Sequence, residues 1–139
     1  MNRAELQQLA EDRNLDAQAL LAANRWSAAY YLAGYAVECA IKSCILVRVD
    51  KSGVIFQEKK FSEQCWTHDV EKLVELAGLK TARDTDTAAN PTLAKNWQTV
   101  KDWDEHSRYQ QMTQSMAREL FDAVNDNTNG VLQWIRNYW

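Results

Sequence analysis

The longest regular pattern in the chain is an apolar segment from Arg25 to Arg48 that carries one narrow polar stripe. The stripe positions follow one another at intervals of four, three, four and four residues: Ser27, Tyr31, Gly34, Glu38 and Lys42. This spacing places them along one edge of an α-helix. Because the rest of this helix is apolar, it must be packed on most of its sides. We therefore expect the central helix of a bundle, with the stripe in contact with specific partners.

Amphipathic patterns predict helices on both sides of this segment. Residues 3–23 have an apolar face of leucine and alanine, and the short connection at Asn24 predicts an antiparallel hairpin with the central helix. A further helix is expected over 68–77, capped by Thr67 and ended by the glycine that follows it. Residues 50–66 show no regular pattern, so we expect a loop there with at most a short extended piece.

The second half of the chain carries two more helical patterns. Asn90 followed by Pro91 is a helix start signal, because proline at the first helical position loses no backbone hydrogen bond, and an apolar face continues to Val100. Residues 112–138 keep an apolar helical register to the end of the chain. The sequence NDNTNG at 125–130 weakens that last helix or breaks it.

No strand pattern competes with these helices. The polar segment TARDTDTAAN at 81–90 is expected to be a loop, and no stretch alternates with a period of two residues. The chain contains only four glycines and one proline. The sequence therefore predicts an all-α fold, a single domain over 1–139 built as an up-and-down bundle of four to five helices.

The composition restricts the classes of partner. The 139 residues carry a formal net charge of −3, so the chain lacks the general basic character of proteins that bind nucleic acids or membrane surfaces. One group of basic residues is loosely spaced along the chain, and a solvent-exposed surface explains it better than a site that binds a nucleic-acid backbone. This group comprises Lys42, Arg48, Lys51, Lys59 and Lys60.

Two features predict a cytoplasmic protein without a membrane segment. The first thirteen residues are charged and lack the apolar core of a signal peptide. The apolar run over 27–46 has nearly the length of a membrane span, but Glu38 and Lys42 lie inside it, at a cost of roughly 2.5–3.5 kcal/mol each at the centre of a bilayer. A packed core helix is therefore the better interpretation of this run.

We expect neither a metal nor another cofactor. Cys39, Cys44 and Cys65 are odd in number and lack C-x-x-C spacing, which is typical of reduced, packed thiols. A zinc site built from Cys65, His68 and His106 would need a fourth ligand, and the C-x-x-H spacing alone is a weak signal.

Three blocks of sequence resemble the HEPN family, which consists of small bacterial and archaeal helical-bundle proteins. The blocks are AYYLAGYAVECAIKSCI at 29–45, THDVEKLVELAG at 67–78 and WDEHSRY at 103–109. The resemblance implies a dimeric bundle, often encoded beside a minimal nucleotidyltransferase in toxin–antitoxin or defence loci.

Many members of the HEPN family are metal-independent ribonucleases whose motif is an arginine followed, after four to six residues, by a histidine. Arg108 matches the arginine, but Thr113, Gln114 and Ser115 stand where the histidine would fall. The general acid–base group that contributes ~10²- to 10⁴-fold to rate is then missing. His106 is the only candidate substitute. If His106 and Arg108 stand near the start of a helix, the arginine and the free amides of that helix start can still hold a phosphate.

Glu38 and Lys42 are further candidate site residues. They are spaced i, i+4 with the acid first, which is the favourable order for an ion pair, and their apolar surroundings predict that both are partly buried. Arg108 is the natural third member of their network. Such a cluster is either a structural network or part of a site, because ion-pair networks perturb pKa values without doing chemistry.

Aromatic residues are candidates for stacking and for a dimer interface. Trp103 and Tyr109 flank the turn that carries the matching arginine, where they either stack on a base or close the end of the bundle. A glycine within a helix costs roughly 0.5–1 kcal/mol relative to alanine, so Gly34 indicates the close approach of another backbone. Tyr31, Gly34 and Tyr35 therefore face either a neighbouring helix or the same helix of a second protomer.

Three functions are consistent with these observations. The first is a homodimeric HEPN-like module that binds nucleotide or RNA, or a nucleotidyltransferase partner, without cutting. Its ligand-binding residues would be Arg108, Tyr109, Trp103, Glu38 and Lys42. The second is a metal-independent endoribonuclease in which Arg108 stabilises the phosphorane charge and His106 moves the proton, which requires both side chains to point into one cleft. The third is a purely structural or regulatory dimer.

Overall fold

The computed structural model describes residues 1–139, and all of its regular structure is helical. Its elements are α1 (Arg3–Ala22), α2 (Trp26–Ser52), α3 (Val54–Gln57), α4 (Phe61–Gln64), α5 (Val70–Leu76), α6 (Lys80–Ala89), α7 (Pro91–Lys101), the 3-10 helix η1 (Glu105–Tyr109), α8 (Gln114–Asn125) and α9 (Val131–Ile135). The all-α prediction is confirmed. The chain forms nine α-helices, however, instead of the four to five that were expected.

The predicted hairpin of α1 and α2 is present, with a connection of three residues between them. Asn2 begins α1 with a capping box: its side chain accepts a hydrogen bond from the backbone N–H of Glu5, and the Glu5 carboxylate accepts one from the backbone N–H of Asn2. Asn24 adopts the left-handed conformation (φ 60°), which the short polar side chain of asparagine tolerates and which reverses the chain. Gly53 ends α2 in the same conformation (φ 63°).

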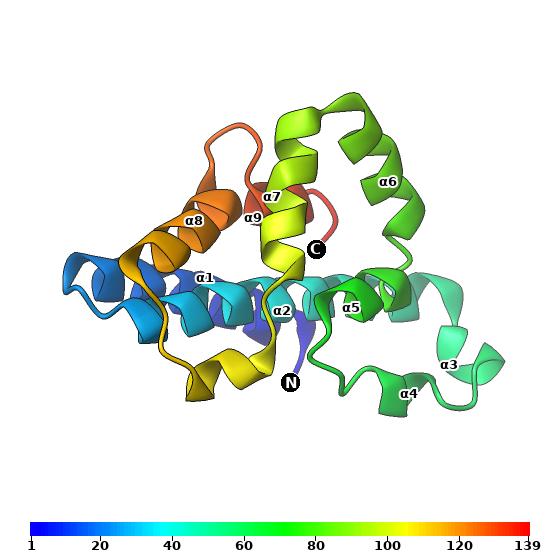
Figure 1. Ribbon diagram of the computed structural model, residues 1–139. Coiled ribbons are helices and arrows are strands. Elements are labelled where there is room, and N and C mark those ends of the chain that lie inside the picture. Colours follow the sequence, from blue (N-terminus) through cyan, green and yellow to red (C-terminus); the bar gives the residue numbers. More distant parts are fainter.

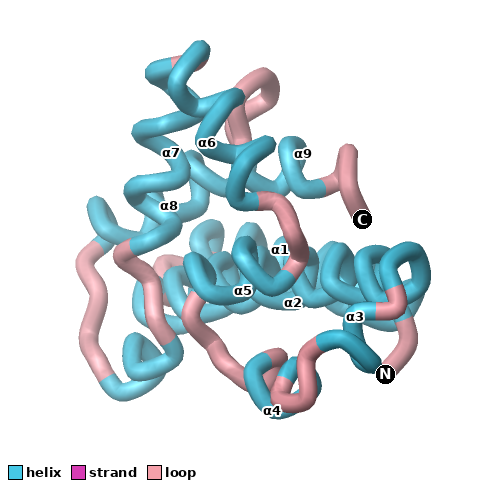
Figure 2. The backbone as a smooth tube through the Cα atoms, turned by 90° about the vertical axis from the view of Figure 1, so that its right-hand side faces the viewer, coloured by secondary structure: helices cyan, strands magenta, loops and turns pink.

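The helices are arranged around the α1–α2 pair rather than parallel to it. Figure 1 shows α7 rising steeply from this pair, with α6, α8 and α9 around it. In Figure 1 and Figure 2, α6, α7 and α9 lie on one side of the pair and α4 lies on the other. Because α6 and α7 stand at a steep angle to the α1–α2 pair in Figure 1, the expected up-and-down bundle is not confirmed.

One hydrophobic core of 32 buried residues joins elements from α1 to α9, and α2 contributes more of it than any other helix. Ala33, Val37, Ala40 and Ile41 of α2 are completely buried. Because α2 packs against α1, α5, η1, α8 and α9, it is the central helix that its apolar circumference predicted. No helix combines the length and the apolar character that crossing a membrane requires.

The segment 50–66 differs from the expected loop. It contains two single-turn helices, α3 and α4, and no extended piece. The buried side chains of Val54 and Phe61 anchor these turns to the core. The helix that follows begins later than expected: Asp69, not Thr67, caps α5 by accepting a hydrogen bond from the backbone N–H of Lys72 (3.1 Å). The pattern failed here because each turn is too short to show a helical period.

The segment 81–90 was expected to be a loop, and this was wrong: it forms most of α6. Its threonines and aspartates are weak helix formers, but the segment contains no glycine, and tertiary contacts hold it. Arg83 is buried, donates two hydrogen bonds to the Glu71 carboxylate and lies over the Trp97 ring at 5.3 Å. Asp86 accepts a hydrogen bond from the indole N–H of Trp134 (2.8 Å). These tertiary contacts outweigh the weak helix propensity of the segment.

The last helical pattern is broken at the NDNTNG sequence, where two outcomes had been left open. The Asp126 carboxylate accepts hydrogen bonds from the backbone N–H groups of Thr128 and Asn129, which builds a tight turn between α8 and α9. Gly130 is needed in this turn, because a Cβ at that position would lie 2.5 Å from the Asp126 carbonyl oxygen. α8 itself begins after Thr113, whose hydroxyl accepts a hydrogen bond from the backbone N–H of Met116.

Candidate functional site

Residues from the second half of the chain contact the polar stripe of α2. Near the start of α2, the Ser27 hydroxyl accepts a hydrogen bond from the backbone N–H of Met112 (2.9 Å). In its middle, Gly34 lies under the indole ring of Trp103, and a Cβ at position 34 would be 2.3 Å from three ring atoms. The partner that explains this glycine is therefore a side chain of the same chain, not another backbone. Gly34 is covered and not available to a second protomer.

Glu38 is the centre of a buried charged network. Its side chain is 2% exposed, and Lys42 Nζ donates to its Oε1 at 2.8 Å. His68 Nδ1 lies 3.0 Å from Oε1 and 3.1 Å from Oε2, while His68 Nε2 lies 3.1 Å from Glu105 Oε2. The third member of the network is therefore His68. Arg108, which the sequence suggested for this place, contacts none of these groups.

The network joins three segments that are distant in the sequence. Glu38 belongs to α2, His68 precedes α5, and Glu105 begins η1. His68 was expected in the first turn of its helix, but it lies before the Asp69 cap, where its ring is free to bridge two carboxylates. Its two ring nitrogens face one carboxylate each, which ties the segment before α5 to both α2 and η1. Every oxygen of Glu38 is engaged, which is the arrangement of a structural cross-link.

Arg108, by contrast, lies on the surface without an acidic partner. No carboxylate forms an ion pair with it, and its guanidinium carbon lies 4.8 Å from the centre of the exposed Tyr109 ring. The phenol of Tyr109, together with that of Tyr31, raises the pKa of Arg108 above its ordinary value. Tyr31 in turn stacks on Tyr35, with ring centres 6.1 Å apart and planes 4° from parallel. We call these four residues the Arg108 surface.

Tyr35, one of these four residues, lies beside the buried thiol of Cys39. Burial raises the pKa of Tyr35 to about 12, with further contributions from Cys39 and Glu38. Burial likewise raises the pKa of Cys39 to about 11 and that of Cys44 to about 12. All three cysteines are free thiols. Thiols held in this protonated form are poor nucleophiles, so these cysteines act as packed apolar groups.

His106 lies in a different environment from Arg108. It lines a hollow of about 450 Å³ whose wall carries five carboxylates and does not include Arg108. These acids are Asp69, Glu71, Asp102, Asp104 and Glu105. His106 is exposed, and its Nδ1 lies 3.4 Å from Asp104 Oδ1. Lys101 is the one lysine in its lining, so the acids outnumber it and the hollow disfavours phosphate. The ribonuclease hypothesis requires a cleft shared by both side chains, and this geometry does not provide one.

Trp103 packs in the core and does not face a ligand. Its side chain is 2% exposed, and its ring packs against Gly34 and lies 6.1 Å from the Tyr31 ring. Of the two alternatives considered for this residue, closing the bundle is the one that its burial supports. Tyr109, on the other side of the turn, is 75% exposed and remains available for stacking.

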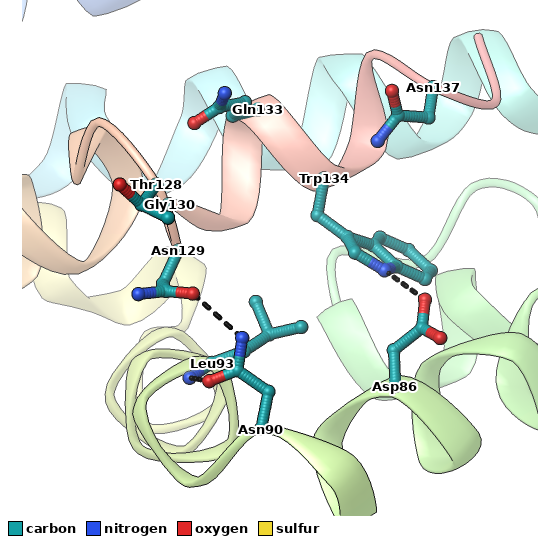
Figure 3. Close-up of a pocket in the computed structure, with 9 residues that line it drawn as sticks. All are labelled: Asp86, Asn90, Leu93, Thr128, Asn129, Gly130, Gln133, Trp134 and Asn137. Carbon is teal, nitrogen blue, oxygen red and sulfur yellow. Dashed lines mark hydrogen bonds between the residues drawn. The ribbon is translucent and has the colours of Figure 1, made fainter.

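A pocket that the sequence did not suggest lies between the start of α7 and the α8–α9 turn. Figure 3 shows Asn90 donating a hydrogen bond to Asn129 (2.7 Å) and Trp134 donating one to Asp86 (2.8 Å) across this pocket of about 390 Å³. Asn90 also caps α7. No basic residue lines the pocket, so it does not attract an anion. The signal that could have located it is the asparagine-rich composition of both segments.

No group of three or more histidine, cysteine, aspartate or glutamate side chains is arranged to hold a metal ion. Cys65 and His68 both line the groove between α1, α2 and α4, but His68 is already held by two carboxylates. No protein family, no curated protein and no solved structure matches this chain. The function is therefore argued from the geometry.

Proposed function

We propose that this protein is a non-catalytic, HEPN-like module that binds a nucleotide unit, free or within single-stranded RNA, at the Arg108 surface. The observation that carries the proposal is the cationic guanidinium of Arg108, which has no acidic partner and lies 4.8 Å from the exposed Tyr109 ring. A guanidinium presents several donors to a phosphate, and an aromatic face accepts a base of any sequence.

The neighbouring tyrosines support the same ligand. Tyr31 and Tyr35 extend the aromatic surface beyond Arg108, and both are only half-buried. Stacking on such residues contributes about 1–3 kcal/mol per base in proteins that bind single strands. Because the surface has one cation without a partner, it fits one phosphate with its base rather than a long backbone track.

The absence of an imidazole beside Arg108 supports binding without cleavage. Thr113 caps α8 with its hydroxyl, and Gln114 and Ser115 follow it in the first turn, so these three positions supply no acid–base group of histidine type. His106 lies in the acidic hollow. A phosphate held by Arg108 therefore lacks the proton transfer that cleavage requires.

Fluorescence anisotropy with a short labelled single-stranded RNA, competed by free nucleoside monophosphate, tests this proposal. We expect binding that Arg108→Ala and Tyr109→Ala each weaken by roughly 1–3 kcal/mol. The matched control is Arg118→Ala, because Arg118 is also exposed and lies 5.5 Å over the Trp26 ring, outside the Arg108 surface. It should leave binding unchanged.

The salt dependence sharpens the test. A single phosphate contact gives a slope of about −0.7 in log affinity against log salt, and Arg108→Ala should remove it. Equal losses for Arg108→Ala and Arg118→Ala would contradict a specific site, as would wild-type protein that binds neither probe. Cleavage of the RNA in chelator would contradict the non-catalytic assignment. A nucleotidyltransferase partner and a toxin–antitoxin or defence context, which the family resemblance implies, stay predictions.

A further inference from the structure

A large apolar groove lies between α1, α2 and α4. Its volume is about 640 Å³, and twelve of its sixteen lining residues are hydrophobic. They include Leu6 and Leu9 of α1, Leu46 and Val49 of α2, and Phe61 of α4. Sites that enclose small molecules have this size, about 300–1,000 Å³, and this predominance of hydrophobic lining with a few polar groups.

Three large apolar residues that line the groove remain exposed. Met1 and Trp66 are each 78% exposed, and Ile55 is 53% exposed. Apolar surface collected in one place on a protein marks an interaction site, and covering it with an apolar molecule is favourable. The groove therefore fits a ligand whose body is apolar.

The polar end of the groove offers hydrogen-bond donors from Lys42. The Lys42 side chain is 23% exposed, and the bond from its Nζ to Glu38 Oε1 (2.8 Å) is the only hydrogen bond that this ammonium group makes within the protein. An ammonium group carries three donors and no acceptor. Two donors of Lys42 are therefore left for an oxygen atom of a ligand.

The other polar groups at this end of the groove are already in contact with one another. Both carboxylate oxygens of Glu38 lie within 3.1 Å of His68 Nδ1, and His68 Nε2 lies 3.1 Å from Glu105. A cationic ligand would have to displace these contacts, because it needs a carboxylate. An anionic ligand would lie beside the Glu38 carboxylate, which repels it. An uncharged oxygen can accept from Lys42 at neither cost.

We infer that this groove binds an uncharged small molecule with an alkyl or other apolar body and one hydrogen-bond-accepting oxygen at its end, which lies at Lys42. Medium-chain alcohols and esters have this chemistry. The inference goes beyond nucleotide binding and does not depend on it, since Arg108, Tyr109 and Tyr31 do not line the groove and only Tyr35 is common to both sites.

Displacement of N-phenyl-1-naphthylamine, an uncharged fluorescent molecule that emits strongly in apolar sites, tests this inference. Three competitors share one chain and differ in their head group: 1-octanol, octanoate and octylammonium. We expect the wild-type protein to bind the fluorescent molecule, and 1-octanol to displace it at the lowest concentration. Absence of binding by the wild-type protein, or tighter binding of either ion than of 1-octanol, would overturn the inference.

A variant at Lys42 tests the hydrogen bond to the ligand. Lys42→Met, checked for a wild-type circular dichroism spectrum, should weaken 1-octanol roughly 2- to 10-fold, which is the effect of one hydrogen bond. It should leave direct binding of N-phenyl-1-naphthylamine unchanged, because that molecule carries no oxygen. Unchanged affinity for 1-octanol would overturn the role of Lys42.

Two valines of α2 provide a matched pair that locates the site without disturbing the charged network. Val47 and Val49 are both half-buried, but Val49 lines the groove and Val47 lines a different hollow. Val49→Trp should fill the groove and abolish binding of both 1-octanol and N-phenyl-1-naphthylamine. Val47→Trp should leave binding unchanged. Equal effects of the two substitutions would overturn the assignment to this groove.

Cys65 locates the ligand in the unaltered protein. It lines the groove and is half-buried, so 1-octanol should slow its alkylation by iodoacetamide. Unchanged alkylation at saturating 1-octanol would overturn the inference.

Two further outcomes would assign the groove or the fluorescent molecule differently. If a second copy of the chain covered the groove, binding per chain would fall as the protein concentration rises. Displacement of N-phenyl-1-naphthylamine by nucleoside monophosphate would place it at the Arg108 surface. Either result would overturn the inference, whereas loss of RNA binding alone would not affect it.

Discussion

The indole ring of Trp103 packs directly on Gly34, so closely that a Cβ at position 34 would lie 2.3 Å from three of its atoms. Both residues are buried, and the contact joins the middle of α2 to the chain that enters η1. Because η1 carries Arg108 and Glu105, this contact positions the Arg108 surface relative to the buried network.

Gly34→Ala should destabilise the protein, although alanine is the better helix former by about 1 kcal/mol. Overpacking against a buried indole costs ~1–3 kcal/mol and exceeds that gain. Urea unfolding should show the loss. The double variant Gly34→Ala, Trp103→Phe should lose less than the sum of the two single changes, because the smaller ring leaves room for the methyl group. Strict additivity would contradict the contact.

Lys42→Met should lower the free energy of unfolding by about 2–3 kcal/mol, because it leaves the nearly buried carboxylate of Glu38 with His68 as its only side-chain partner. Lys80→Met is the matched control, since Lys80 pairs with Asp84 at the same i, i+4 separation on an exposed surface. It should change stability little. Equal effects of the two substitutions in urea unfolding would show that burial of Glu38 does not matter.

Arg83→Ala should release α6, because Arg83 holds this polar helix through Glu71 and Trp97. We expect a loss of about 2–3 kcal/mol and faster amide hydrogen exchange over 80–89 than elsewhere. Burial alone lowers the pKa of Arg83, but Glu71 and Asp84 more than offset it, so the pKa is raised and the residue stays charged. Arg83→Lys should restore only part of the stability, since lysine lacks the two-pronged contact. Full rescue by lysine would contradict this role.

Stability should fall as the pH rises above about 9, because burial raises the pKa of Cys39 from 9.0 to about 11 and that of Cys44 from 9.0 to about 12. In the unfolded chain these thiols lose their protons first, so their stabilising contribution is complete below pH 9.0 and is lost as the pH approaches the folded values.

Each thiol contributes on the order of 2 kcal/mol across this window. Urea midpoints measured at several alkaline pH values check this loss of stability, and Cys44→Ala should make the fall of stability with pH less steep. Unchanged stability at alkaline pH would contradict the contribution of the buried thiols.

Cys65, which is only half-buried, should be the first thiol alkylated by iodoacetamide at neutral pH. Alkylation of Cys39 before Cys65 would contradict the expected order of reaction.

Local pattern was sufficient for the strongest elements of the fold. The apolar circumference of α2 and the capping signals at Asn90 and Gly78 are properties of consecutive residues, and the structure confirms them. The interruption at 125–130 was left open between a weakened and a broken helix, and the structure shows a break. The polar stripe of α2 could also be predicted from the sequence. Gly34 and Glu38 are unfavourable in an apolar helix unless specific partners contact them there.

What met that edge depended on tertiary structure. Glu38 binds His68 and not Arg108, because the residues before α5 are folded back against α2, and no periodicity reports such a long-range contact. α6 is a helix because Arg83 and Asp86 find partners in other elements. The sequence by itself determined that the chain is all-helical and that one apolar helix lies at its centre, because the spacing of apolar residues along a helix is a property of neighbouring residues. Only the tertiary structure decided which charges are enclosed and which, like that of Arg108, have no acidic partner, because enclosure depends on residues far apart in the chain.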